Sequence, residues 1–146
     1  MTKANSLETG LLDLIFLNSN IANIGDATGL RGSSTAGSLY VSLHTSDPGE
    51  AGDQTTNETA YTNYARVAVA RSGSGWSRSG STTSNVAAIT FPTGGVTGAT
   101  VTHFGVGTAS SGAGVLLYKG SLTSSLVVGS GVTPEFAAGD LDISED

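Results

Sequence analysis

The sequence has no cysteine among its 146 residues, so it can form neither a disulfide, a thiolate metal site nor a cysteine nucleophile. Charge is scarce as well: Asp, Glu, Lys and Arg make up 12% of the chain, about half of the roughly 25% that is typical of globular domains. Only 6 residues are basic against 12 acidic ones, a formal net charge of -6. This balance argues against nucleic acids and anionic membranes as partners, because both favour a basic surface.

Long apolar runs are absent near the N-terminus, where the longest is Leu14 to Leu17. That run is far too short to span a membrane. A secretory signal needs an uninterrupted apolar core after a basic start, and Glu8 and Asp13 interrupt any such core behind Lys3. We therefore expect no targeting segment.

Small and β-branched residues take the place of the missing charges. The chain contains 21 glycines and is rich in serine, threonine and valine. A disordered chain would have few β-branched residues and a high fraction of charge, which is the opposite composition. The length suits one domain, and abundant threonine is typical of exposed strand faces. The composition therefore favours a folded, β-rich domain with many turns.

Helical periodicity is confined to the beginning of the chain. Asn5 can cap a helix, and Glu8 lies three residues later, where a capping box places an acid. One helical face would carry Leu7, Leu11, Leu14 and Ile15, and the stripe is widened by Leu12, Phe16 and Leu17. A helix this short is marginal alone in water. We expect it to pack either on its own domain or on a neighbouring subunit.

A period of two replaces the helical pattern at residue 39. Leu39, Val41 and Leu43 are expected to face one way, and Tyr40, Ser42 and His44 the other. The strand should end in a turn at Ser46-Asp47-Pro48-Gly49. Further strands are predicted around residues 65–69, 86–91, 100–106, 115–119, 122–128, 132–136 and 141–143.

Short strands at regular spacing predict an all-β fold, an antiparallel jelly-roll-like β-sandwich with a short N-terminal α-helix. We expect residues 1–24 to form the helical arm and residues 25–146 the single sandwich domain. Gly73 to Asn85 is a low-complexity stretch that we expect to form a loop around Trp76. Gly120 is expected to separate two strands.

No motif predicts catalysis, a cofactor or a metal. His44 and His103 are the only histidines, and serine is so common that a nearby serine carries no signal. The glycines at 105 and 107 lack the Lys-Ser/Thr ending of a phosphate loop. We therefore expect a protein that is not an enzyme.

Protein contacts are the expected alternative to chemistry, because Trp and Arg dominate hot spots in protein interfaces. Trp76 is either an exposed anchor flanked by arginines or a loop residue folded back on the domain. The candidate interface residues are Leu7, Leu11, Ile15, Phe16, Arg31, Arg71, Trp76 and Arg78.

Several strand and turn motifs of the chain are distinctive. They are Leu39-Tyr-Val-Ser-Leu-His-Thr-Ser-Asp-Pro-Gly-Glu-Ala-Gly52, Tyr64-Ala-Arg-Val-Ala-Val69, Ala88-Ile-Thr-Phe-Pro92, His103-Phe-Gly-Val-Gly107, Leu116-Leu-Tyr118 and Ala138-Gly-Asp-Leu141. These motifs resemble a widespread family of small tailed-bacteriophage structural proteins. Together with the opening helix they cover nearly the whole chain. Members are often labelled tail-fibre proteins, and some are similar to capsid cement proteins with jelly-roll sandwiches.

The resemblance implies a virion protein. We expect a cement or decoration protein on the capsid exterior, with the major capsid protein as partner and a homotrimer as the assembled form. The chain is short and has no long shaft, which favours the head over the tail. The alternatives are a tail or fibre-attachment component and, from another class, a carbohydrate-binding module. The last needs exposed aromatic platforms, and aromatic residues make up only 6% of the chain.

Overall fold

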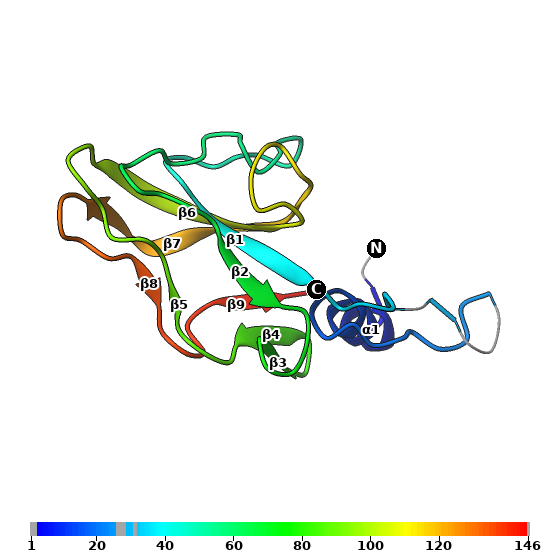
Figure 1. Cartoon of the computed structure of the whole chain (residues 1–146). Coiled ribbons are helices and arrows are strands. Elements are labelled where there is room, and N and C mark those ends of the chain that lie inside the picture. The colour runs from blue at the N-terminus through cyan, green and yellow to red at the C-terminus, as the bar shows by residue number, and fades with distance from the viewer. Residues whose placement is uncertain (1–2, 26–28, 31, 146) are drawn as a thin grey trace. The chain divides into compact units, whose positions relative to one another are not determined.

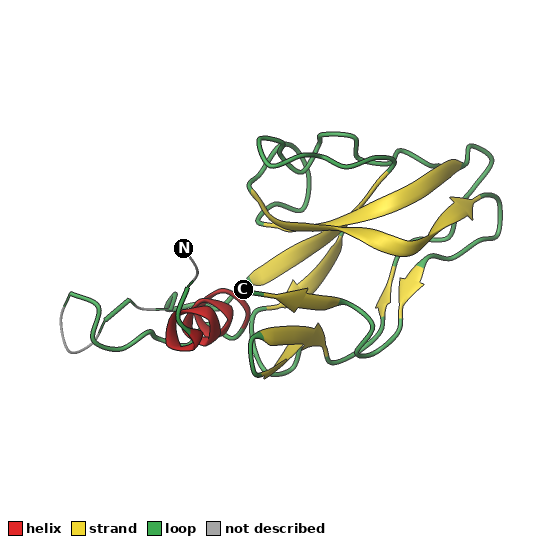
Figure 2. Ribbon diagram, turned by 180° about the vertical axis from the view of Figure 1, so that it is seen from behind, coloured by secondary structure: helices red, strands yellow, loops and turns green. Residues whose placement is uncertain are grey.

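The computed structural model describes residues 3–25, 29–30 and 32–145. One helix, α1 (Asn5–Phe16), precedes a series of strands (Figure 1). The strands are β1 (Ser38–His44), β2 (Val67–Ala70), β3 (Trp76–Ser79), β4 (Thr82–Asn85), β5 (Ile89–Thr90), β6 (Ala99–Gly107), β7 (Leu116–Val128), β8 (Glu135–Phe136) and β9 (Asp142–Ser144). Antiparallel sheets with one short N-terminal helix confirm the expected fold class, an all-β sandwich (Figure 2).

The chain divides into two compact units, each assembled from segments that are far apart in the sequence. The first, here called the helical unit, comprises Met1–Ser38, Val69–Ala88 and Phe136–Asp146. The second, the sheet unit, comprises Leu39–Ala68 and Ile89–Glu135. The helix α1 thus shares its unit with β3, β4 and β9. Among the described residues, no helix is long and apolar enough to cross a membrane.

The largest sheet has the strand order β2-β1-β6-β7, and β5 pairs with β8. Strands β1 and β6 are antiparallel, with Tyr40 opposite Gly107 and His44 opposite His103. Ser42 and His44, which were expected to face away from Leu39, Val41 and Leu43, are buried along with these apolar residues. The chain after β1 returns to this face, where the Thr56 carbonyl lies 2.9 Å from His44 Nδ1.

Strand β7 runs unbroken from Leu116 to Val128, so the predicted separation at Gly120 was wrong. Gly120 lies opposite Phe104 on β6. A Cβ atom built at this glycine would lie 2.6 Å from Cε1 of the Phe104 ring. The glycine therefore makes room for an aromatic ring within a continuous strand, which is one of the roles glycine has in sheets.

The helical unit contains a β-hairpin that was not predicted from the low-complexity composition of its sequence. Residues 73–85 were expected to form a loop, yet β3 and β4 pair there, with Ser79 opposite Thr82. Gly80 and Ser81 form the two-residue connection, and Gly80 has a φ of +60°. A Gly-Ser pair between two short runs is a known hairpin signal. Strand β9 completes this sheet in the order β3-β4-β9.

The helix α1 begins where expected but is capped differently. Ala4 occupies the N-cap position and no side chain caps the helix, so the predicted capping box was wrong. Asn5 is instead the first helical residue, and its carbonyl accepts from Thr9 Oγ1 at 2.8 Å. The helix ends at Phe16, Leu17 occupies the C-cap position, and Asn18 has a φ of 57°.

The buried face of α1 differs from the predicted stripe. Glu8, Leu12 and Phe16 are buried, at a spacing of four residues. Leu7 is exposed and Leu11 is half-buried, although both were placed on the inner face. Apolar residues occupy a wide arc of the helix surface, so the periodicity alone does not say which part of that arc is buried. Contacts made by the β3–β4 hairpin decide it.

Candidate functional site

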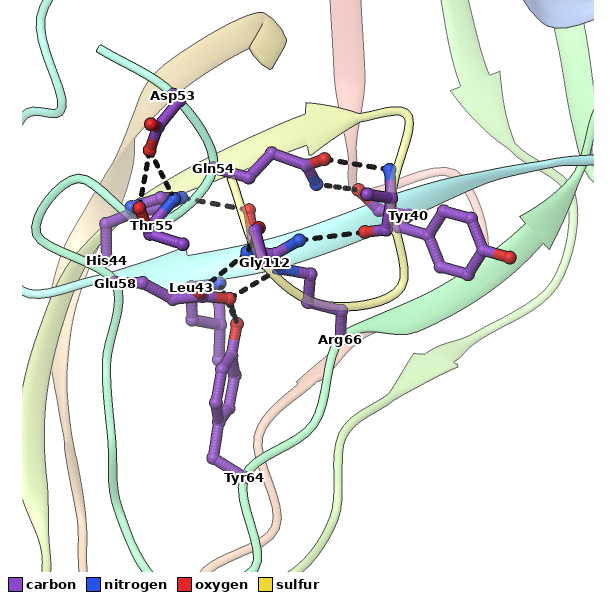
Figure 3. Close-up of polar contacts among 12 residues, drawn as sticks. Tyr40, Leu43, His44, Asp53, Gln54, Thr55, Glu58, Tyr64, Arg66 and Gly112 are labelled. Atoms are coloured by element: carbon purple, nitrogen blue, oxygen red, sulfur yellow. Dashed lines mark hydrogen bonds and ion pairs between the residues drawn. The ribbon is translucent and has the colours of Figure 1, made fainter. Parts of the chain in front are cut away.

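A buried ion pair lies at the centre of the polar contacts in the sheet unit (Figure 3). Arg66 Nε lies 2.6 Å from Glu58 Oε1, and Nη2 lies 2.8 Å from Oε2. The side chains are only 2% and 16% exposed. Such a fork-to-fork geometry is the strongest form of a charge-assisted pair. The hydrogen bond to Glu58 raises the pKa of Arg66, so the guanidinium group stays charged.

The remaining donors of Arg66 hold the loop between β6 and β7. Nη1 donates to the Ala109 carbonyl at 2.8 Å, and Nη2 donates to the Gly112 carbonyl at 2.8 Å. On the other side of the pair, the Tyr64 hydroxyl donates to Glu58 Oε1 at 2.8 Å and accepts from the Leu43 N–H at 3.1 Å. Burial raises the pKa of Tyr64, which keeps the hydroxyl protonated. Every group of the network is thus engaged with its own unit.

Gln54 ties the same loop to β1. Its side chain is fully buried. The Gln54 N–H donates to the Ala113 carbonyl at 2.9 Å, while Oε1 accepts from the Ala109 N–H at 2.9 Å. Nε2 reaches the Tyr40 carbonyl at 3.5 Å. A buried amide whose groups are all directed at backbone partners specifies one loop position.

Gly107 provides the space that Gln54 occupies, and this leads to a prediction. A Cβ at residue 107 would lie 2.2 Å from Gln54 Cδ. We expect Gly107→Ala to displace the amide and lower the free energy of unfolding by about 1 to 3 kcal/mol. Gly129→Ala is the matched control, because nothing lies within 4 Å of a Cβ there. Urea unfolding of both variants checks the difference, and equal midpoints would contradict it.

His44 and Ser42 form a hydrogen-bonded pair, with Ser42 Oγ 2.9 Å from His44 Nε2. A serine and a histidine at this distance are the first two members of a hydrolytic triad. Here both side chains are completely buried, and His44 Nδ1 faces the Thr56 carbonyl at 2.9 Å instead of a carboxylate. A carbonyl can only accept, so the neutral ring donates from Nδ1 and accepts at Nε2. No substrate reaches Ser42 in this arrangement, and the pair braces β1.

Stability should depend on pH through His44. Burial lowers the pKa of His44 below its ordinary value of 6.5, although the bond to Thr56 opposes the shift. Between the folded pKa and 6.5 the unfolded chain binds more protons, so stability is lost as the pH falls through this window. One proton limits the slope to about 1.4 kcal/mol per pH unit. Urea titrations from about pH 7.5 to 5 should show a flatter profile for His44→Gln; an unchanged slope contradicts this.

The other polar candidates are used locally. Asp47 Oδ1 accepts from the Gly49 N–H at 2.8 Å, which confirms the predicted turn, and Asp47 also pairs with Lys119 at 3.0 Å. Asp53 Oδ1 accepts from the Thr55 N–H at 2.8 Å. His103 Nδ1 lies 2.8 Å from Thr102 Oγ1. Within the described residues, no group of three His, Asp or Glu side chains could hold a metal ion.

Trp76 and Phe16 are completely buried, so the expectation of Trp76 as an exposed anchor was wrong. Their rings meet edge to face, with centroids 4.8 Å apart and planes at 70°. The other alternative, a tryptophan folded back on its own domain, describes its place. This contact also shows that α1 packs within its own unit.

Two of the three predicted interface arginines, Arg71 and Arg78, bind α1 instead of flanking an exposed ring. Arg71 Nε donates to the Ile15 carbonyl and Nη2 to the Leu14 carbonyl, each at 2.7 Å. Arg71 therefore neutralises the free carbonyls at the C-terminal end of the helix, where a cation is favoured. Arg78 forms a forked ion pair with Asp13, and this pairing raises the pKa of Arg78.

The remaining interface candidates keep their role as predictions. Leu7 is 38% exposed, and Leu11 and Ile15 are half-buried. Arg31 lies outside the described residues.

The sequence did not single out Gln54, Glu58, Tyr64 or Arg66. Their signal was the rarity of charge: Glu58 and Arg66 are opposite charges on either side of a short aromatic segment, in a chain with only 12% charged residues. Opposite charges that lie close together in a sequence with few charges are candidates for a buried ion pair, because charged residues are seldom buried unless they are paired.

Comparison with known proteins points to one family. The family model described as podophage GP4 fiber I protein gp80 matches residues 3–144. A search of the curated proteins finds no match. The match covers both units and includes the opening helix, the Arg66 network and β9. The chain therefore belongs to the podophage GP4 fiber I protein gp80 family, a family of bacteriophage structural proteins.

Proposed function

We propose that this phage structural protein is a capsid cement protein, which binds the outer face of the major capsid shell and bridges neighbouring subunits. Its partner is then the major capsid protein, and its assembled form is a homotrimer, which places three copies of each contact on one shell site. Many weak contacts raise the overall affinity without any single strong one.

The observation that carries the proposal is that the polar side chains of the sheet unit bind partners within that unit. The ionic and amide groups of the sheet unit, from Gln54 to Arg66, are directed at backbone and side chains of their own unit. Such bracing makes a rigid surface and keeps the polar groups of this network engaged with protein partners.

Cryo-electron microscopy of the virion tests the location. We expect density for this chain on the outside of the head, at sites between neighbouring major capsid subunits. Density on the tail alone, with none on the head, contradicts the proposal. Particles produced without this protein should release their DNA at a lower temperature than complete particles.

A tail or fibre component is the second candidate, favoured by the description of the family as a fiber protein. The two candidates differ in copy number. Quantitative mass spectrometry of purified virions should find a cement protein at a level near that of the major capsid protein. A fibre component would be present in far fewer copies.

A further inference from the structure

One end of the sheet unit carries no charge. From Ser79 to Pro134 the sequence has a single charged residue, Lys119. We call residues 92–101 and 126–133 the charge-free end; they form the loop before β6, the loop after β7 and the adjoining strand ends. The Gly94 N–H donates to the Val132 carbonyl at 2.8 Å, so the two loops lie side by side (Figure 1).

Val96 stands at the tip of the loop before β6 and is 93% exposed. Backbone bonds on both sides hold this tip: the Gly95 N–H donates to the Thr62 carbonyl at 3.1 Å, and the Thr62 N–H donates to the Thr97 carbonyl at 2.9 Å. A Cβ at Gly95 would lie 2.7 Å from Thr62 Cγ2, so the close approach needs glycine. The valine is thus presented by a loop that is already ordered, which reduces the entropy lost on binding.

A second exposed valine lies in the same region. Val127 is 68% exposed, and its neighbour Leu126 is 36% exposed. Val127 is paired with Thr100, near the start of β6 and directly after the Val96 loop. Depletion of charge with exposed apolar side chains is the composition of the core of a protein interface.

We propose that the charge-free end is the surface through which copies of this chain associate with one another. The inference deepens the self-association within the proposed function and names its site. We choose a second copy of the chain as the partner at this surface because of the chain's negative net charge. The sheet unit contains five carboxylates and two cations, a formal charge of -3, and the whole chain carries -6. Two copies repel wherever those carboxylates face each other, and the charge-free end avoids that repulsion.

Sedimentation velocity of the full chain over a range of concentrations tests the proposal. We expect the wild-type chain to self-associate and Val96→Asp and Val127→Asp each to weaken the association at least tenfold, because each places a carboxylate in the contact. Val96→Thr, which replaces a methyl group by a hydroxyl group without adding charge, should weaken it less. Val115→Asp is the matched control, because Val115 is 58% exposed in the same unit but outside the charge-free end.

Salt supplies a second measurement. Raising the ionic strength screens the repulsion between acidic copies, so the association should tighten or stay constant. A wild-type chain that remains monomeric overturns the proposal, as does association that Val115→Asp weakens as much as Val96→Asp does. Circular dichroism of each variant confirms that it is folded. Association in solution and location on the virion are measured separately. Absence of the protein from the head would not contradict self-association, and a monomeric chain would not contradict a location on the head.

Discussion

Replacing Arg66 by alanine is expected to lower the free energy of unfolding by about 3 to 5 kcal/mol. The substitution leaves the Glu58 carboxylate, 16% exposed, without its cation. It also removes the donors to the Ala109 and Gly112 carbonyls, which hold the loop between β6 and β7. The large effect arises because a desolvated carboxylate loses the cation that compensates its charge, and not because the intact pair is worth that much.

Urea unfolding followed by circular dichroism measures this effect. Lys119→Ala is the matched control, because it breaks the more exposed pair with Asp47, whose side chains are 27% and 54% exposed. An exposed pair contributes little to stability, because water and salt screen the attraction. Arg66→Lys should recover only part of the loss, since an ammonium group cannot form the fork to Glu58 and also reach two carbonyls. Equal losses for Arg66→Ala and Lys119→Ala would show that the network does not brace the unit.

Replacing Trp76 by alanine should cost about 3 to 5 kcal/mol, the usual range for a fully buried aromatic side chain. The ring is 0% exposed and meets Phe16 edge to face, so its removal opens a cavity under α1. The helix is short and relies on this contact for its stability. We therefore expect loss of the helical signal in circular dichroism at a lower urea concentration than in the wild-type chain.

Trp76→Phe separates ring packing from hydrogen bonding. Trp76 Nε1 is buried and has no hydrogen-bond partner among the residues that the structure describes. The change to phenylalanine loses volume but no bond, so it should cost clearly less than the change to alanine. Val86→Ala is a control in the same unit, because Val86 is 43% exposed and its truncation should cost little. A loss for Val86→Ala as large as that for Trp76→Ala would contradict the assignment of Trp76 to the core.

The candidate site was harder to predict than the fold because its partners are distant in sequence. Arg66 binds carbonyls 43 and 46 residues away, and Arg71 binds carbonyls of α1 that are 56 and 57 residues away. Nothing local distinguishes an arginine that caps a helix from one that faces a partner. The predicted interface therefore included Arg71 and Arg78, both of which the fold uses internally.

The sequence by itself determined the local structure: an N-terminal helix from a period near 3.6, β1 and β6 from a period of two, and the turn at residues 46–49 from Asp47 and Gly49. These signals are local, since a side chain's direction follows from backbone geometry within a few residues. Only the tertiary structure decided which side of α1 is covered, why both faces of β1 are buried and how Gly120 fits within β7. These three features depend on contacts with residues that are distant in the sequence, and a local periodicity does not specify which distant residues make those contacts.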